Sequence, residues 1–238
     1  MRLFAASIAV AAVALVAAAS AAPQNPPAAT GGTDVYHVML TKAAPGQAAE
    51  LGKALMVPDK TSPMPEHFVV LRHQEGDDWD YAVIEHLGAK AEVVGTPPTA
   101  AQTAARPMTA WHNDTFASGP GWGEFSRQMG LGGSGGANPV YVIGMHRALP
   151  GHRDQLMSAL NAPAAASSKI QTGNILLQHI EGGDWNLLTL TRYNSWQDLG
   201  SDRAGLASAA AGPGGWADIR QHSAFHRDTI ADRIFPAK

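Results

Sequence analysis

The sequence predicts an α+β fold in which one unit, ordered strand, helix, strand, strand, helix, strand, occurs twice along the chain. Three observations predict it. Three blocks of sequence recur in the same order, a Pro-Gly step in each copy separates an apolar strand pattern from a helix pattern, and each copy has two further strand patterns joined by a Gly-containing turn.

The repeated blocks are distributed along the length of both copies. Residues 35–55 (VYHVMLTKAAPGQAAELGKAL) match residues 140–160 (VYVIGMHRALPGHRDQLMSAL) without a gap. Residues 71–87 then match residues 177–193, and residues 110–117 match residues 224–231. Because the order is kept and the offset grows only slowly along the chain, we interpret the blocks as two diverged copies of one domain.

The expected elements follow from the strand period of two and from the turn residues. The expected strands are 36–42, 68–74 and 79–87 in the first copy and 141–147, 174–180 and 185–193 in the second, with a short last strand starting near Asp114 and near Asp228. Helices are expected at 47–55 and 152–160, and an Ala-rich helical region precedes each last strand. The hairpin turns are centred on Gly76-Asp77 and Gly182-Gly183. This order is that of a ferredoxin-like unit.

The N-terminus has the pattern of a secretory signal peptide at residues 1–21. Arg2 precedes an apolar stretch, and Ala19-Ser20-Ala21 supplies the small residues of a cleavage site, so we expect an exported protein, periplasmic or secreted. Residues 22–33 are expected to form a disordered tether, and the Gly-rich residues 118–138 a linker. The two repeats are then residues 34–117 and 139–238.

Composition excludes several classes of function. The chain has no cysteine, which excludes disulfides, thiolate metal sites and thiol nucleophiles. It has a net charge of -3 and no run of Lys or Arg, so a nucleic-acid partner is not expected. No segment after the signal peptide is apolar enough to cross a membrane, so no membrane contact is expected after cleavage. The oligomeric state stays open.

The element order, the Pro-Gly after the first strand and the tandem length make the chain resemble the dimeric α+β barrel superfamily. That superfamily includes antibiotic-biosynthesis monooxygenases and, as fused tandem copies, chlorite dismutases. The resemblance implies two four-stranded sheets packed face to face, with helices outside and a cavity between the sheets. It covers nearly all of the mature chain, but it includes no catalytic motif and therefore predicts the fold rather than the activity.

Strand alternation divides each sheet into one apolar face and one mixed face. Pairing across the first hairpin places Arg72 opposite Tyr81. We expect the apolar face to lie under the helices and the mixed face to line the cavity. Residues of the mixed face that differ between the copies are the candidate ligand-binding residues, because a fused pair needs only one working site. They are His37, Met39, Arg72, Tyr81, Glu85, His146 and Gln178.

Residues kept in both copies are interpreted as structural. They include His112 with His226, which we place at a helix end, Asp114 with Asp228, which we place in turns, and Trp79 with Trp185, which we expect to plug the barrel end. Their spacing favours no metal site. No cofactor is predicted. Haem is disfavoured because His222 and His226 lie among polar neighbours.

The function indicated is an exported small-molecule-binding protein with no assignable catalytic motif. The alternative is a cofactor-independent monooxygenase-like enzyme that uses the same cavity. A purely structural module is the third possibility, and it predicts a cavity filled by side chains.

Overall fold

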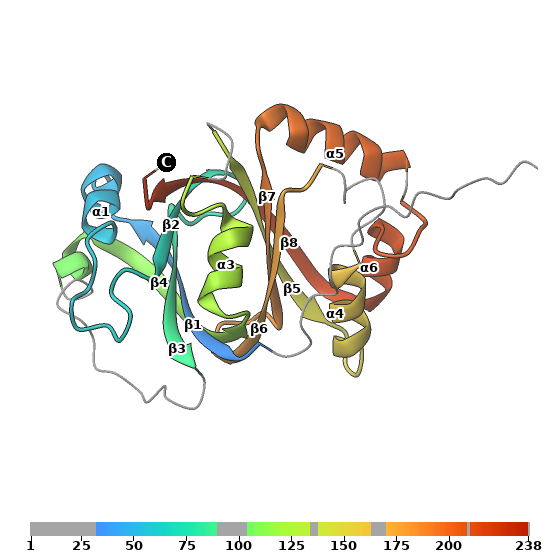
Figure 1. Cartoon of the computed structure of the whole chain (residues 1–238), viewed down its shortest axis with the longest axis horizontal. Coiled ribbons are helices and arrows are strands. Elements are labelled where there is room, and N and C mark those ends of the chain that lie inside the picture. The colour runs from blue at the N-terminus through green and yellow to red at the C-terminus, as the bar shows by residue number, and fades with distance from the viewer. Residues whose placement is uncertain (1–31, 90–103, 134–137, 163–169, 209, 238) are drawn as a thin grey trace, which may run out of the picture.

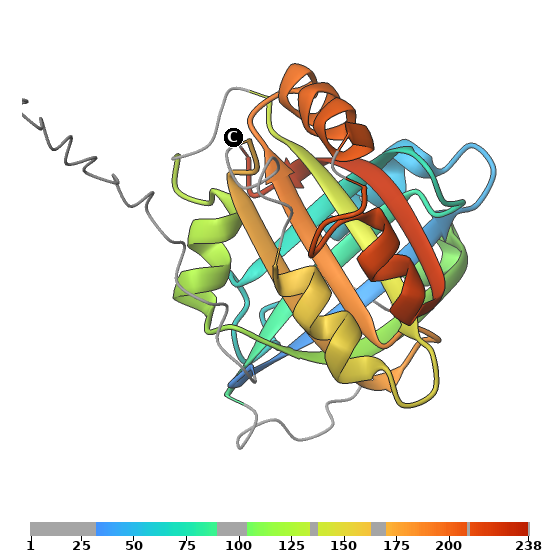
Figure 2. The same ribbon diagram turned by 90° about the vertical axis from the view of Figure 1, so that its right-hand side faces the viewer.

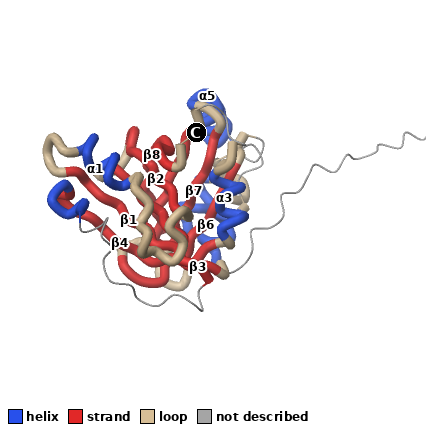
Figure 3. The backbone as a smooth tube through the Cα atoms, turned by 60° about the vertical axis from the view of Figure 1, so that its left-hand side comes forward, coloured by secondary structure: helices blue, strands red, loops and turns tan. Residues whose placement is uncertain are grey.

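In the computed structural model, eight antiparallel strands close into a single barrel with helices on its outside (Figures 1, 2 and 3). The structure describes residues 32–89, 104–133, 138–162, 170–208 and 210–237. The signal peptide and nearly all of the tether lie outside the described residues, so export stays a prediction.

The chain begins with β1 (Asp34–Ala43), α1 (Ala48–Leu55), β2 (Phe68–Glu75), β3 (Tyr81–Ala89), the 3-10 turn η1 (Arg106–Met108) and β4 (Thr109–Gly119). It continues through α3 (Trp122–Met129), β5 (Val140–Ala148), α4 (Arg153–Asn161), β6 (Gly173–Gly182), β7 (Leu187–Tyr193), α5 (Trp196–Ser208), α6 (Trp216–His222) and β8 (Ser223–Phe235). The barrel order is β1-β3-β2-β8-β5-β7-β6-β4. The strand order β4-β1-β3-β2 of the first half thus recurs as β8-β5-β7-β6 in the second, and the pairs β2–β8 and β4–β6 join the halves.

The hairpin register is confirmed. Arg72 pairs with Tyr81 in the first hairpin and Gln178 pairs with Leu187 in the second. The hairpins stay centred on the expected turns as far as His73 N–H, which donates to Asp80 O at 2.9 Å, and His179 N–H, which donates to Asn186 O at 3.0 Å. Beyond these bonds the strands separate, so the tight two-residue turns are not formed. Glycine is still needed at the turns, where Gly76 and Gly182 have φ of 123° and 109°.

Two expectations about the end of each half are wrong. The last strands are long and start before the expected points, so His112 lies within β4 and His226 within β8 rather than at helix ends. The segment expected to be a linker contains the helix α3, which packs Phe125 and Met129 into the core. These two apolar side chains are four residues apart and therefore share one face of the helix.

The apolar face of each sheet lies inside the barrel, which reverses the expected assignment. One core cluster joins Tyr36, Val38 and Leu40 of β1 to Tyr141, Ile143 and Met145 of β5, and it includes both Trp79 and Trp185. An eight-stranded barrel has an interior just wide enough to be filled by side chains. The mixed face therefore points outward, toward the helices.

Candidate functional site

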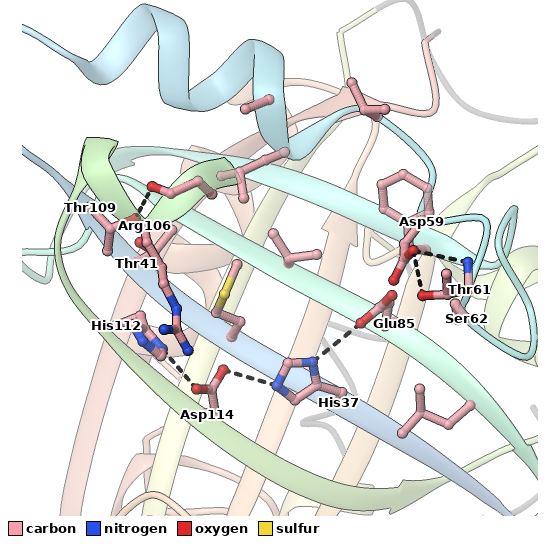
Figure 4. Close-up of a pocket in the computed structure, with 18 of the residues that line it drawn as sticks. His37, Thr41, Asp59, Thr61, Ser62, Glu85, Arg106, Thr109, His112 and Asp114 are labelled. Carbon is pink, nitrogen blue, oxygen red and sulfur yellow. Dashed lines mark hydrogen bonds and ion pairs between the residues drawn. The ribbon is translucent and has the colours of Figure 1, made fainter. Parts of the chain in front are cut away.

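The main cavity lies outside the barrel, between the outer face of β4, β1 and β3 and the cover formed by α1, residues 56–63 and η1. Its volume is about 820 Å³. Its apolar lining includes Met39, Leu55, Phe68, Val83, Leu87 and Phe116. The polar side chains on its wall include His37, Glu85, Asp114, His112 and Arg106 (Figure 4).

The polar wall follows from the strand register. His37 of β1 pairs with Glu85 of β3 on one side, and on the other side Met39 pairs with Asp114 of β4. Thr41 pairs with His112, two residues further along both strands. Residues two apart on a strand share a face, so these side chains stand side by side on the outer surface of the sheet.

A histidine held between two carboxylates forms the centre of this wall (Figure 4). His37 Nε2 lies 2.9 Å from Asp114 Oδ1, and His37 Nδ1 lies 3.3 Å from Glu85 Oε2. On the far side of Asp114, Oδ2 lies 2.7 Å from His112 Nδ1. The side chains of His37 and Glu85 are 10% and 18% exposed, and that of His112 is 51% exposed. The chain of contacts therefore runs from the buried wall to the solvent.

Electrostatics make His37 a cation at neutral pH. Burial alone would lower its pKa, but the hydrogen bonds and charges of Asp114 and Glu85 outweigh burial and raise the pKa to about 9. The opposite balance holds for Asp114. Burial would raise its pKa, whereas His37 and His112 lower it overall. The cavity thus contains an imidazolium whose two N–H groups both point at carboxylates.

Three of the sequence candidates, His37, Met39 and Glu85, line this cavity together. They do so on the outer surface of the barrel, not in the cavity between sheets that the resemblance implied. The expected position of the mixed face was wrong, and the ligand-binding role of these three residues stays a prediction.

Arg72 and Tyr81 do not line the cavity. Arg72 makes two hydrogen bonds of 2.9 and 3.1 Å to Asp232, at the junction of β2 and β8, so its charge joins the two halves. Tyr81 lies beneath α1, where its hydroxyl donates to the carbonyl oxygen of Ala48 at 2.7 Å. A Cβ on Gly52 would lie 2.6 Å from that hydroxyl oxygen, so the glycine allows α1 to approach the sheet.

His146 and Gln178 belong to the second half and do not line this cavity. Gln178 is half-buried in β6, beside Ser118 of β4. His146 is buried and its ring stacks on His226, with 4.6 Å between ring centroids. It occupies the position that Thr41 has in the first half, since its strand partner is His226 where that of Thr41 is His112.

The sequence reasoning missed His112, Asp114 and Arg106. His112 and Asp114 were assigned a structural role because both copies keep them, and Arg106 lies outside the strand patterns that supplied the candidates. A signal was available: His112 and Asp114 are two residues apart, so they share a face as soon as the strand is extended back to His112, as it is in β4. Among the residues that the structure describes, no group of three or more His, Asp or Glu is arranged to hold a metal ion. In the same part of the chain, no helix is long and apolar enough to cross a membrane.

The buried His146 predicts a loss of stability at acidic pH. Burial and the neighbouring His226 lower its pKa from 6.5 to about 4. The contribution of neutral His146 to the free energy of unfolding is therefore present above pH 6.5 and is lost as the pH falls through 4, because in this range the unfolded chain accepts the proton more readily than the folded one. The substitution His146→Thr should reduce the loss between pH 7 and pH 4 by a few kcal/mol, measured by urea unfolding. An equal loss of the free energy of unfolding between pH 7 and pH 4 in the wild type and in His146→Thr would contradict the prediction.

The comparisons with known proteins identify the fold. Neither a protein-family model nor a curated protein matches the sequence. Solved structures do match. An anthrone oxidase-like protein superposes with a TM-score of 0.58 and 10% identity, over 85% of this chain and 92% of its own. A "putative monooxygenase" from Fusobacterium nucleatum superposes with a TM-score of 0.56 and 8% identity, over 85% and 93%.

The chain therefore shares the α+β barrel fold of these solved structures. A further "putative monooxygenase", from Lactobacillus acidophilus NCFM, superposes with a TM-score of 0.50 and 9% identity, over 84% of this chain and 94% of its own. At such identities the likeness concerns the barrel architecture alone. Any activity within the superfamily has to be argued from the cavity itself.

Proposed function

We propose that this chain oxidises a small, largely apolar aromatic molecule with molecular oxygen in the cavity on β1, β3 and β4, without a resident cofactor. The observation that carries the proposal is the His37 imidazolium, held between Glu85 and Asp114 on one wall of a cavity whose other walls are largely apolar. The similar folds of an anthrone oxidase-like protein and of monooxygenase-like proteins support it.

The chemistry matches such a wall. When an electron-rich aromatic compound such as an anthrone loses a proton, its anion can pass electrons to O2 directly. The CH2 group becomes a C=O group, one oxygen atom enters the product, and the other leaves as water. Negative charge develops on the ring system and on the oxygen, so fixed positive charge nearby lowers the barrier. In this cavity His37 offsets the negative charge of Glu85 and Asp114, and Arg106 adds a guanidinium to the lining.

Oxygen uptake with anthrone as the probe tests the proposal. The protein should consume O2 faster than a buffer blank, and Met39→Trp should abolish the excess because the indole would fill the floor of the cavity. Leu149→Trp is the control, since Leu149 is exposed and lies outside the cavity. Uptake equal to the blank, or uptake unchanged in the Met39 variant, would sink the proposal.

Binding without turnover is the second candidate, and the size and apolar lining of the cavity favour it. The same experiment separates the two, because a binding protein would quench or shift the fluorescence of a bound aromatic probe without oxygen uptake. We further propose that the two halves arose by tandem fusion of one ferredoxin-like unit, covering residues 34–117 and 139–238, and that residues 1–21 direct export.

A further inference from the structure

The polar wall contains an imidazole whose outer nitrogen is available to a ligand. His112 is half-exposed at the cavity wall, and its Nδ1 lies 2.7 Å from Asp114 Oδ2. A carboxylate at Nδ1 keeps the hydrogen on that nitrogen and leaves Nε2 as an acceptor. Within the described part of the chain, His112 Nε2 makes no hydrogen bond. The imidazole is thus oriented as a base.

Asp114 is itself held in place from its other oxygen. His37 Nε2 donates to Oδ1 at 2.9 Å, and His37 is fixed in turn by Glu85 at 3.3 Å. Asp114 therefore cannot rotate away from His112 without losing a charge-assisted hydrogen bond. It acts as a positioning residue for the His112 ring.

Arg106 brings positive charge to the same place. It belongs to η1 and lines the same cavity as His112 and Asp114 (Figure 4). A guanidinium is always charged and suits an oxygen anion. The charged groups facing His112 are thus Arg106 from η1, Asp114 from β4 and His37 from β1, with Glu85 of β3 beyond them.

The second half provides an internal comparison. It keeps the same pair, but His226 reaches Asp228 through Nε2, at 2.8 Å, and not through Nδ1. His146 stacks on His226, and Arg203 binds Asp228 at 2.9 Å. The pair of the second half is therefore engaged by other side chains and does not line the main cavity, whereas His112 does.

We propose that His112 is the general base of the cavity, and that the ligand presents to it an acidic hydroxyl of a phenol or an enol. The O–H bond of the ligand breaks, its proton passes to His112 Nε2, and Asp114 stabilises the imidazolium that forms. The electron pair stays on the ligand oxygen, whose anion is held by Arg106. No oxidant takes part in this step. The inference deepens the proposed oxidation, since it names the ligand class and the base of the same cavity.

Para-nitrophenol is a suitable probe because only its phenolate is yellow and because it consumes no oxygen. At a pH near the pKa of the free phenol, binding to the wild-type protein should increase the phenolate absorbance and lower the apparent pKa of the probe by about one unit, a tenfold change in favour of the anion. His112→Gln should remove this shift while leaving a folded protein. His226→Gln, the matched substitution in the second half, should keep it.

Two further variants distinguish proton transfer to His112 from stabilisation of the phenolate by the charge of Arg106. Asp114→Asn should weaken the shift while the neutral phenol still binds, because the tautomer of His112 is no longer fixed. If His112→Gln keeps the full shift and Arg106→Gln loses it, the arginine alone stabilises the phenolate and the assignment of the base is wrong. Binding of the neutral phenol with no colour change in the wild type would also overturn it.

The two proposals fail in different ways. If the phenolate shift depends on His112 but no oxygen is taken up with anthrone, the proposed oxidation is wrong and the assignment of His112 as the base stands. Oxygen uptake that is equal in the wild type and in His112→Gln removes the base and keeps the oxidation.

Discussion

Replacing Trp185 with alanine should lower the free energy of unfolding by about 3 to 5 kcal/mol, the usual cost of removing a large aromatic side chain from a core. Trp185 is 2% exposed and belongs, with Trp79, to the cluster that fills the barrel. The interior of a closed barrel cannot collapse easily around the space that is left. Urea unfolding of the ligand-free protein measures the effect.

Trp216→Ala is the matched control, because Trp216 lies on the surface with 63% of its area exposed. Its loss should change the stability by about 0.5 kcal/mol or less. An unchanged unfolding midpoint for Trp185→Ala, with ligand binding lost, would show that the indole serves a ligand and not the core.

The second large effect concerns His37, whose cation joins Glu85 to Asp114. Its pKa is raised from 6.5 to about 9, so its contribution to stability is fully present below pH 6.5 and is lost as the pH rises through 9. The wild type should therefore lose a few kcal/mol more than His37→Gln between pH 6 and pH 10, because glutamine keeps polar contacts but cannot titrate. Urea unfolding at several pH values tests the sign.

The same substitution should reduce oxygen uptake by about 100-fold or more, as expected when a fixed group that stabilises developing charge is removed. Removing the cation also leaves Glu85 and Asp114 with no positive charge between them. An equal decline of stability with pH in wild type and variant would refute the cationic state of His37, and full activity in the variant would refute its role in the reaction.

The candidate site could be predicted only in part. Among the unmatched residues of the mixed face, His37, Met39 and Glu85 do line one cavity, because alternation along a strand is a local property. The choice of residues that differ between the copies excluded His112 and Asp114, because both copies keep them and they were interpreted as structural. The structure places the first pair on a cavity, whereas a stacked His146 covers the second pair. Whether the His–Asp pair of a copy lines a cavity depends on contacts between strands that are distant in sequence.

The strands and the register of both hairpins could be predicted from the sequence, because turn residues and strand period act over a few neighbouring positions. The sequence also separated the two faces of each sheet. Which face points inward was decided only by the tertiary structure. The pairs β2–β8 and β4–β6 close the barrel and bury the apolar faces of both halves against each other, so the mixed face of β1, β3 and β4 meets α1 and η1 around the cavity.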